Sequence, residues 1–245
     1  MIRLTGVSKE LGGRMVLDNL DLEVGEGELL CIIGGSGQGK SVILKHILGF
    51  MKPDRGDIRV GGVSIARASQ KELYEVRKTY GVLFQSAALL FSLNVGENLA
   101  LPLREHTDLD EARIAEIVRE RLSWVELEGH EETMPPDLSG GMLKRAGLAR
   151  AIVRDPKIIL FDEPTTGLDP VLSATIGKLI TSLRSRLRFT GIAVTHDMNL
   201  AYMIADRIAM LYDGRIIESG TPKEIKNSRN PRVQEFIHGM PALIA

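Results

Sequence analysis

The chain has 245 residues, of which 44% are hydrophobic and 26% charged, and its formal net charge is -1. This size suits one α/β domain with an insertion, and the even spread of basic residues excludes an electrostatic footprint for nucleic acid. No stretch approaches the roughly 20 apolar residues that span a bilayer. The single cysteine, Cys31, excludes an internal disulfide. Because no charged-then-apolar leader begins the sequence, we expect a non-exported protein.

The N-terminal third is rich in predicted strands. Residues 2–7 and 16–24 alternate between apolar and polar side chains, and residues 57–65 continue this pattern. A strand is predicted from Glu28 to Ile33, and its apolar run contains Cys31 as a small buried hydrophobe. A helix is predicted at 41–48, directly after a glycine-rich loop.

The glycine-rich loop fits the pattern G-x-x-x-x-G-K-[ST] between a strand and a helix, the context that a phosphate-binding loop requires. Its glycines let backbone N–H groups surround a β-phosphate, its lysine reaches the β- and γ-oxygens, and its hydroxyl ligates magnesium. The residues predicted to bind nucleotide here are Gly34, Gly35, Ser36, Gly37, Gln38, Gly39, Lys40 and Ser41.

The middle of the chain turns helical after a predicted strand at 80–84, which Gln85 follows. Apolar residues recur at helical spacing after a cap expected near Thr107 or Asp108, and Pro135-Pro136 breaks the chain. The periodic residues are Ile114, Ile117, Val118, Leu122 and Val125.

Two further segments suggest nucleotide hydrolysis. Ser139, Gly140 and Gly141 precede an apolar-periodic helix, and their flexible backbone offers N–H groups to an anion at its N-terminus. A buried strand from Ile158 ends in Asp162 and Glu163, and two adjacent carboxylates suit a site that holds a cation and a water.

Strands and helices alternate again after Pro156, which predicts a parallel sheet. A helix is expected from about Pro170, with a solvated basic face formed by Arg184, Arg186 and Arg188, and a strand at 191–195 precedes His196. Asp213-Gly214 predicts a hairpin, and residues 221–224 form a capping box for a short helix.

The order of these motifs, with Gly167-Leu168-Asp169 after the carboxylates, resembles an ABC-type ATPase over nearly the whole chain. The resemblance implies an α/β, P-loop NTPase fold of the ABC type, with a RecA-like parallel-sheet core, an N-terminal antiparallel β-subdomain and an inserted helical subdomain. It implies one ABC ATPase domain over 1–245, with a catalytic core at about 1–88 and 156–245 and a helical subdomain at about 89–155.

The resemblance also implies roles for the predicted residues. Asp162 would hold Mg²⁺ through water, Glu163 would polarise the attacking water, and Gln85 would contact the metal and relay the transport signal. His196 would sense the γ-phosphate of ATP. Two subunits of this family enclose two ATP molecules head to tail, so Ser139, Gly140, Gly141 and Asp169 would act across the interface of a homodimer, and Ser139 to Gly141 would cover the nucleotide bound by the other subunit's Lys40.

Residues 83–90 and 102–107, together with Met142 where most relatives carry glutamine, resemble the ATPase of Mla/MCE-type phospholipid transporters. That family pairs an ATPase dimer with integral membrane permease subunits and an MCE-type lipid-binding protein. The implied location is the cytoplasmic face of the bacterial inner membrane, as a peripheral subunit, and the implied cargo is phospholipid or a similar lipid.

Other interpretations stay open. Phe91, Leu93, Val95 and Leu99 could be ordinary core, residues 104–106 an ordinary surface turn, and the transporter one for another substrate. A non-transport ABC ATPase would carry a long heptad insertion or a second ATPase unit, and neither occurs here. A catalytically inactive partner binder commonly lacks the base that Glu163 provides.

One position departs from the family pattern. Many ABC ATPases stack adenine on an aromatic residue shortly after the first strand, and Leu11 occupies that place. Leucine lacks a π-face, so part of the roughly 1 to 3 kcal/mol that base stacking supplies should be absent. The sequence therefore predicts weak discrimination between ATP and GTP, unless Arg14 or Val16 packs on the base.

Overall fold

A computed structural model describes residues 1–239, which divide into two units. Unit 1 comprises Met1–Arg77 and the chain from Thr190 onwards, and unit 2 comprises Lys78–Phe189. This division differs from the expected one, because unit 2 holds the strands on either side of the helical stretch as well as the helices. The predicted core extends to residue 245, and its last six residues lie outside the described range.

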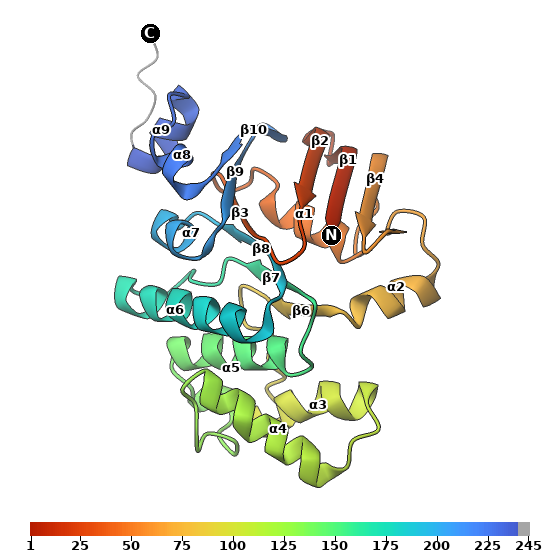
Figure 1. Ribbon diagram of the computed structural model, residues 1–245, viewed down its shortest axis with the longest axis vertical. Helices are drawn as coiled ribbons and strands as arrows, with labels where there is room; N and C mark the ends of the chain where they lie inside the picture. Colours follow the sequence, from red (N-terminus) through yellow and green to blue (C-terminus); the bar gives the residue numbers. More distant parts are fainter. Residues whose placement is uncertain (240–245) are drawn as a thin grey trace. The chain divides into compact units, whose positions relative to one another are not determined.

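Unit 1 begins with an antiparallel sheet in the order β2-β1-β4-β5 (Figure 1). Its alternating pattern buries one face, as Ile2 and Leu4 of β1 show. The predicted strand at 57–65 is two strands, because Gly61 and Gly62 both adopt positive φ and turn the chain between them. The strands are β1 (Ile2–Leu11), β2 (Arg14–Val24), β4 (Arg55–Val60) and β5 (Val63–Ser64).

The second sheet segment of unit 1 is parallel at its centre. Strand β3 pairs in parallel with both β8 and β9, and β3 and β8 are buried along their whole length. The predicted Asp213-Gly214 hairpin is confirmed, with φ of 45° and 74° at its two residues. The strands are β3 (Leu29–Ile33), β8 (Thr190–Thr195), β9 (Arg207–Tyr212) and β10 (Arg215–Gly220).

Five helices complete the described part of unit 1. Helix α1 directly follows the glycine-rich loop, and the predicted capping box is confirmed at the start of α8, where Thr221 and Glu224 each bond the other's backbone N–H. The helices are α1 (Lys40–Ile47), α2 (Gln70–Arg77), α7 (Met198–Ile204), α8 (Pro222–Lys226) and α9 (Pro231–His238).

Unit 2 contains two parallel strands and a group of helices (Figure 1, yellow to teal). Helix α5 contacts β6, α3, α4 and α6, so it is the central element of this unit. The elements are β6 (Tyr80–Leu83), α3 (Val95–His106), α4 (Glu111–Trp124), the 3₁₀ turn η1 (Pro135–Asp137), α5 (Gly140–Ile152), β7 (Ile158–Asp162) and α6 (Pro170–Leu187).

The start of α4 differs from the expectation. Asp110, not Thr107 or Asp108, caps the helix, and its carboxylate accepts a hydrogen bond from Arg113 N at 2.8 Å. Thr107 instead ends α3, because its hydroxyl donates to Leu103 O at 2.7 Å. Arg104 lies on the last turn of α3 rather than in a surface turn, and it forms ion pairs with Glu97 on α3 and Glu111 on α4.

The apolar residues after Gln85 divide between core and surface. Val95 and Leu99 are fully buried, whereas Leu90 and Phe91 are 46% and 62% exposed. On α4, Trp124 is flanked by two guanidinium groups, with Arg121 3.9 Å and Arg186 of α6 5.3 Å from the ring centre. No helix within residues 1–239 is both long and apolar enough to cross a membrane.

Candidate functional site

The glycine-rich loop wraps around the side chain of Lys40, its second-last residue. Lys40 is 6% exposed, and its ammonium donates to Gly34 O at 2.8 Å and Gly35 O at 3.0 Å. A Cβ on Gly34 would lie 2.4 Å from Leu211 O, and one on Gly39 2.8 Å from Val16 Cγ1, at φ of 154° and 99°. No side chain could replace these two glycines without moving the loop or its neighbours.

The start of α1 suits an anion. Gly39 is the N-cap, it supplies no side-chain acceptor, and no acidic residue lies in the first turn. The first N–H groups of a helix attract negative charge when no side chain caps them. Gln38 ties the loop to the β9-β10 hairpin, because its Oε1 accepts from Asp213 N at 2.9 Å. These features fit a phosphate group above the loop.

His196 lies in unit 1 immediately after β8 and is exposed. The chain is fixed on both sides of it: Thr195 Oγ1 accepts from Asp197 N at 3.0 Å, and the Asp197 carboxylate caps α7 through Asn199 N and Leu200 N. The backbone therefore holds this histidine at the end of a buried parallel strand, where the sequence predicts it.

The paired carboxylates lie in unit 2 at the end of β7. Four buried apolar residues precede Asp162, and Glu163 leaves the strand with a left-handed φ of 49°. Thr166 holds the Glu163 side chain, with its hydroxyl 3.2 Å from Oε2. A non-glycine residue in this conformation costs of order 1 kcal/mol or more and is typical of functional positions.

Gln85 follows β6 and is exposed. The turn after it is also left-handed, with φ of 60° at Ala87 and 53° at Ala88. Arg150 on α5 fixes this turn by donating to Ala88 O at 2.6 Å and Ala87 O at 3.0 Å. The glutamine therefore projects from a segment whose backbone is held from one side by α5.

The serine-glycine segment forms the N-terminus of α5. Ser139 is the N-cap and its hydroxyl accepts from Met142 N at 3.3 Å, so one of the amides that the sequence offers to an anion is capped here. Gly140 is exposed and Gly141 is buried, where a Cβ would lie 3.2 Å from a methyl group of Leu172. Asp169 is exposed and caps α6 through Val171 N and Leu172 N.

Sequence reasoning missed Lys144. On this helix, which the sequence predicts from its apolar periodicity, Leu143 is half-buried and Lys144 is only 5% exposed. Its ammonium donates to Gln85 O at 2.5 Å and Glu163 O at 3.3 Å. Burial lowers the pKa of Lys144, opposed by the charges of Glu163 and Asp162. A lysine within a run of small and apolar residues was the available signal.

The residues predicted to hold Mg²⁺ carry the kinds of ligand that this ion prefers. Ser41 of unit 1 has a hydroxyl oxygen, and Gln85 and Asp162 of unit 2 have an amide and a carboxylate oxygen, hard ligands that this ion takes while keeping several waters. Within residues 1–239 no group of three or more His, Cys, Asp or Glu side chains could hold a metal.

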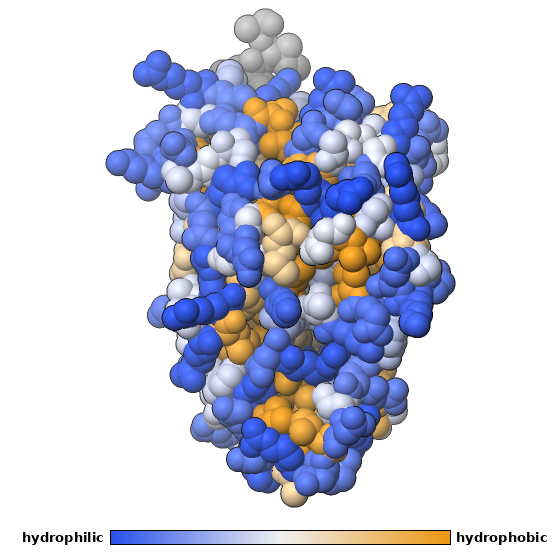
Figure 2. Space-filling model, turned by 45° about the vertical axis from the view of Figure 1, so that its right-hand side comes forward, coloured by the Kyte–Doolittle hydropathy of each residue, from blue (hydrophilic) through white to orange (hydrophobic). Residues whose placement is uncertain are grey.

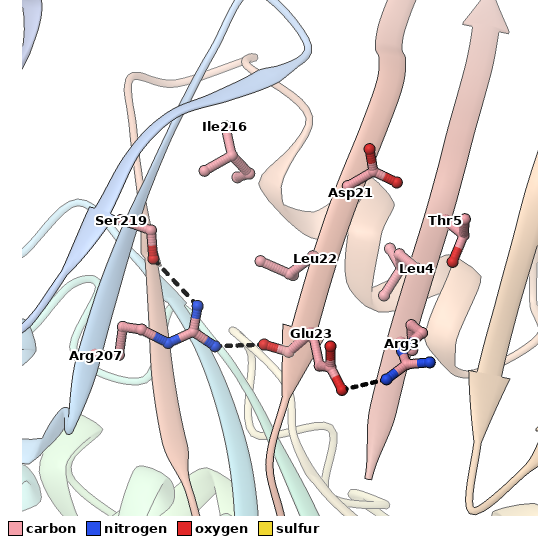
Figure 3. Close-up of a pocket in the computed structure, with 9 residues that line it drawn as sticks. All are labelled: Arg3, Leu4, Thr5, Asp21, Leu22, Glu23, Arg207, Ile216 and Ser219. Carbon is pink, nitrogen blue, oxygen red and sulfur yellow. Dashed lines mark hydrogen bonds and ion pairs between the residues drawn. The ribbon is translucent and has the colours of Figure 1, made fainter.

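A pocket of unit 1 is lined by none of the predicted site residues (Figure 3). Its polar groups bond one another: Arg207 donates to Ser219 Oγ at 3.2 Å and to Glu23 O, and Arg3 pairs with the Glu23 carboxylate at 2.5 Å. Satisfied in this way, the pocket is not a candidate for the nucleotide. Its lining residues are Arg3, Leu4, Thr5, Asp21, Leu22, Glu23, Arg207, Ile216 and Ser219.

Comparison with known sequences gives a family and several relatives. Residues 17–166 match the ABC transporter family. A probable ribonucleotide transport ATP-binding protein of Mycobacterium leprae is 43% identical over 238 residues, covering 97% of this chain and 69% of that protein. The intermembrane phospholipid transport system ATP-binding protein of Haemophilus influenzae is also 43% identical, over 98% of this chain and 90% of its own. Its Escherichia coli K12 counterpart is 40% identical, over 98% and 89%.

Two solved structures share the fold. A dimeric, post-hydrolysis state of an ATP-binding cassette bound to ADP and Pi matches with a TM-score of 0.83 and 32% identity, over 91% of this chain and 99% of that one. The protein cbiO1 of Clostridium perfringens, part of the ABC transporter complex cbiONQ, matches with a TM-score of 0.85 and 27% identity, over 97% of this chain and 98% of that one.

Proposed function

This chain belongs to the ABC transporter family, and we propose that it is the ATP-hydrolysing subunit of a bacterial transporter that moves phospholipid or a similar lipid across or out of the inner membrane. The expected P-loop ABC fold is confirmed by the solved relatives, and the chain is an ATPase of this family that uses ATP with Mg²⁺. Within that class, the cargo is the open question.

The observation that carries the lipid proposal is the match along nearly the full length of two phospholipid transport proteins. The alignments cover 90% and 89% of those proteins, against 69% of the Mycobacterium leprae protein named for ribonucleotide transport. The segment 83–90 and Met142 support the same assignment through the resemblance described above. A transporter for another substrate is the second candidate, and the mycobacterial name favours it.

We propose the following division of work among the residues. The loop from Gly34 to Ser41 binds the phosphates of ATP, with Lys40 neutralising the β- and γ-oxygens. Asp162, through water, and Ser41 and Gln85 hold Mg²⁺, which supplies charge neutralisation on the transferring phosphoryl group. Glu163, held by Thr166, orients the attacking water and accepts its proton, and His196 contacts the γ-phosphate.

A head-to-tail homodimer would complete each site. Ser139, Gly140, Gly141 and Asp169 lie at or beside the N-termini of α5 and α6, and all but the buried Gly141 are exposed. In the proposed dimer they cover the nucleotide of the other subunit. Phosphoryl transfer depends on positioning and charge stabilisation, so one subunit alone lacks part of the catalytic site.

The proposed permease contact lies beside Gln85. Leu90 and Phe91 are exposed apolar residues five and six positions after the glutamine, a place where a partner can influence it. Figure 2 shows apolar residues reaching the surface in separate patches on the face it displays. The partners would be integral permease subunits and an MCE-type lipid-binding protein, with this chain peripheral at the cytoplasmic face.

Co-expression with the permease and MCE-type genes of its own operon tests this proposal. Affinity purification should recover a membrane complex that hydrolyses ATP faster than the purified chain, which binds Mg-ATP but turns over slowly. Phe91→Asp should abolish recovery of the permease, whereas Phe50→Asp, at an equally exposed phenylalanine in unit 1, should not. Recovery of an unrelated permease would overturn the lipid assignment. Absence of ATPase activity in the assembled complex would instead indicate a catalytically inactive partner binder.

A further inference from the structure

Lys144 holds together two segments to which the proposed mechanism gives different tasks. Its ammonium donates to the backbone of Gln85 at 2.5 Å and of Glu163 at 3.3 Å. The first segment carries the residue proposed to receive the permease signal, and the second carries the proposed base. Both acceptors are backbone carbonyls, so the lysine sets the course of the chain and leaves the two side chains available.

Because Lys144 is buried, breaking its hydrogen bonds costs free energy. An ammonium with so little exposure loses most of its hydration and depends on its acceptors to compensate. If the Gln85 segment moved away, the charge would keep only the longer bond to Glu163 O. Leaving this buried ammonium with a single long hydrogen bond would cost free energy, which therefore resists independent motion of the two segments.

Helix α5 contacts the Gln85 segment at three positions within about two helical turns. Lys144 bonds Gln85 O, a Cβ on Gly147 would lie 2.8 Å from the Ala87 Cβ, and Arg150 bonds the carbonyls of Ala87 and Ala88. Positions 144, 147 and 150 are three residues apart, the spacing that aligns side chains along one helix face. Only Lys144 also reaches Glu163.

Glu163, at the other end of this link, has an unusual backbone conformation. Glu163 has a left-handed φ of 49°, and its carbonyl accepts both Lys144 Nζ and Thr166 N. Its carboxylate is bonded to the hydroxyl of the same Thr166. A displacement of the Glu163 carbonyl therefore also displaces the Glu163 carboxylate, because both groups are bonded to Thr166 within one turn of four residues.

We propose that Lys144 is a positioning residue that couples the Gln85 segment to Glu163, so that engagement of a partner at the former sets the orientation of the base at the latter. This inference rests on the proposed function for the roles of Gln85 and Glu163. Helix α5 begins with the serine-glycine segment, which is proposed to cover the nucleotide of the second subunit. Binding of that nucleotide would therefore also act on the helix that carries Lys144.

The test compares Lys144→Met, which keeps the length and apolar stem but removes the charge, with Lys178→Met at an exposed lysine on α6. Measurements are the melting temperature, ATP affinity, and kcat and KM with and without the permease complex. For Lys144→Met we expect unchanged ATP affinity and KM, a fall in kcat of about ten- to a hundredfold, the usual result of a displaced catalytic group, and loss of permease stimulation. Lys178→Met should match the wild type in every measurement.

Two results would overturn the coupling. One is a Lys144→Met protein that keeps wild-type kcat and stimulation. The other is a lower melting temperature with parallel losses of binding and turnover, which a purely structural lysine would produce. If the methionine variant does not fold, Lys144→Gln, which keeps N–H donors without charge, replaces it and should show the same selective fall in kcat. Wild-type protein without ATPase activity would contradict the proposed function rather than this inference.

Discussion

Glu163 and Lys40 allow hydrolysis to be separated from binding at the level of single residues. Glu163→Gln should retain ATP affinity and lose about two to four orders of magnitude in kcat, the usual worth of a positioned general base. Lys40→Ala should weaken ATP binding itself, by roughly ten- to a hundredfold, because a charge-assisted phosphate contact is worth about 1.5 to 3 kcal/mol.

Equilibrium binding and steady-state turnover measured on both variants decide the matter. The glutamine variant should also accumulate as an ATP-bound dimer, visible by size-exclusion chromatography with nucleotide. A division of labour between these residues is ruled out if both substitutions reduce ATP affinity equally. Lys178→Met, remote from the loop in sequence and exposed, serves as the control for a lost lysine charge.

The residues expected to contact the adenine base can also be tested by single substitutions. Leu11 and Met15 are 38% and 49% exposed on either side of the β1-β2 turn, and Val16 packs against Gly39 of the phosphate loop. None of these three side chains carries an aromatic ring, so we expect a binding preference for ATP over GTP of less than about tenfold, or 1.4 kcal/mol. Leu11→Tyr should tighten ATP binding by adding a stacking face.

Titration of both nucleotides into the wild type and Leu11→Tyr measures the effect, with Leu11→Met as an aliphatic control. Strong ATP selectivity in the wild type without any gain in the tyrosine variant would show that another group already recognises the base. If Leu11→Tyr tightens the binding of ATP and GTP equally, the tyrosine stacks on either base without distinguishing between them.

At the scale of elements, α5 and β6 meet at a position that admits no side chain. A Cβ on Gly81 would lie 2.1 Å from Ala151 O, a backbone atom that cannot rotate away. Gly81→Ala should therefore destabilise the protein by roughly 1 to 3 kcal/mol and lower the melting temperature by about 2 to 4 °C for each kcal/mol. Gly25→Ala, where the nearest atom would be 3.4 Å away at the tip of a glutamate, should melt within about 1 °C of the wild type. An unchanged melting temperature for Gly81→Ala would show that α5 shifts freely against β6.

Local chemistry explains which elements were predictable. The hairpin at Asp213-Gly214 and the capping box at Thr221 depend on neighbouring residues alone, and both are confirmed. The cap of α4 was misplaced because Thr107, Asp108 and Asp110 are all suitable caps, and only the bond from Thr107 to Leu103 assigns the first of them to α3. The burial of Lys144 depends on carbonyls 59 and 19 residues away along the chain, which helical periodicity does not register.

For the whole molecule, a composite site predicts complementation between inactive variants. Lys40→Ala lacks a working phosphate loop and Ser139→Arg lacks a working covering segment. A mixture forms heterodimers in which one site combines the intact halves, so ATPase activity should return when the two proteins are mixed with Mg-ATP and remain absent in either alone. Turnover of the wild type should also rise with protein concentration. No recovery on mixing, with heterodimers verified by differential tags, would exclude catalysis across the interface.

The sequence was sufficient for the family, the fold and the order of the motifs, because glycines, a lysine and carboxylates at fixed places between strands carry that information locally. The roles of the predicted site residues, from the phosphate loop to Glu163, His196 and Asp169, stay predictions, since they depend on nucleotide and on a second subunit. Cargo was the least accessible property, because in the proposed assembly the substrate contacts the permease rather than this chain.

The only tryptophan of the chain gives unit 2 a built-in optical reporter. Trp124 belongs to α4, and the two guanidinium groups beside its ring come from α4 itself and from α6. Its emission therefore depends on whether these helices stay together: separation would remove Arg186 and admit water, shifting the spectrum to longer wavelength. Movement within this unit during nucleotide binding or partner docking can be followed in the unlabelled protein, without introducing a dye or a second tryptophan.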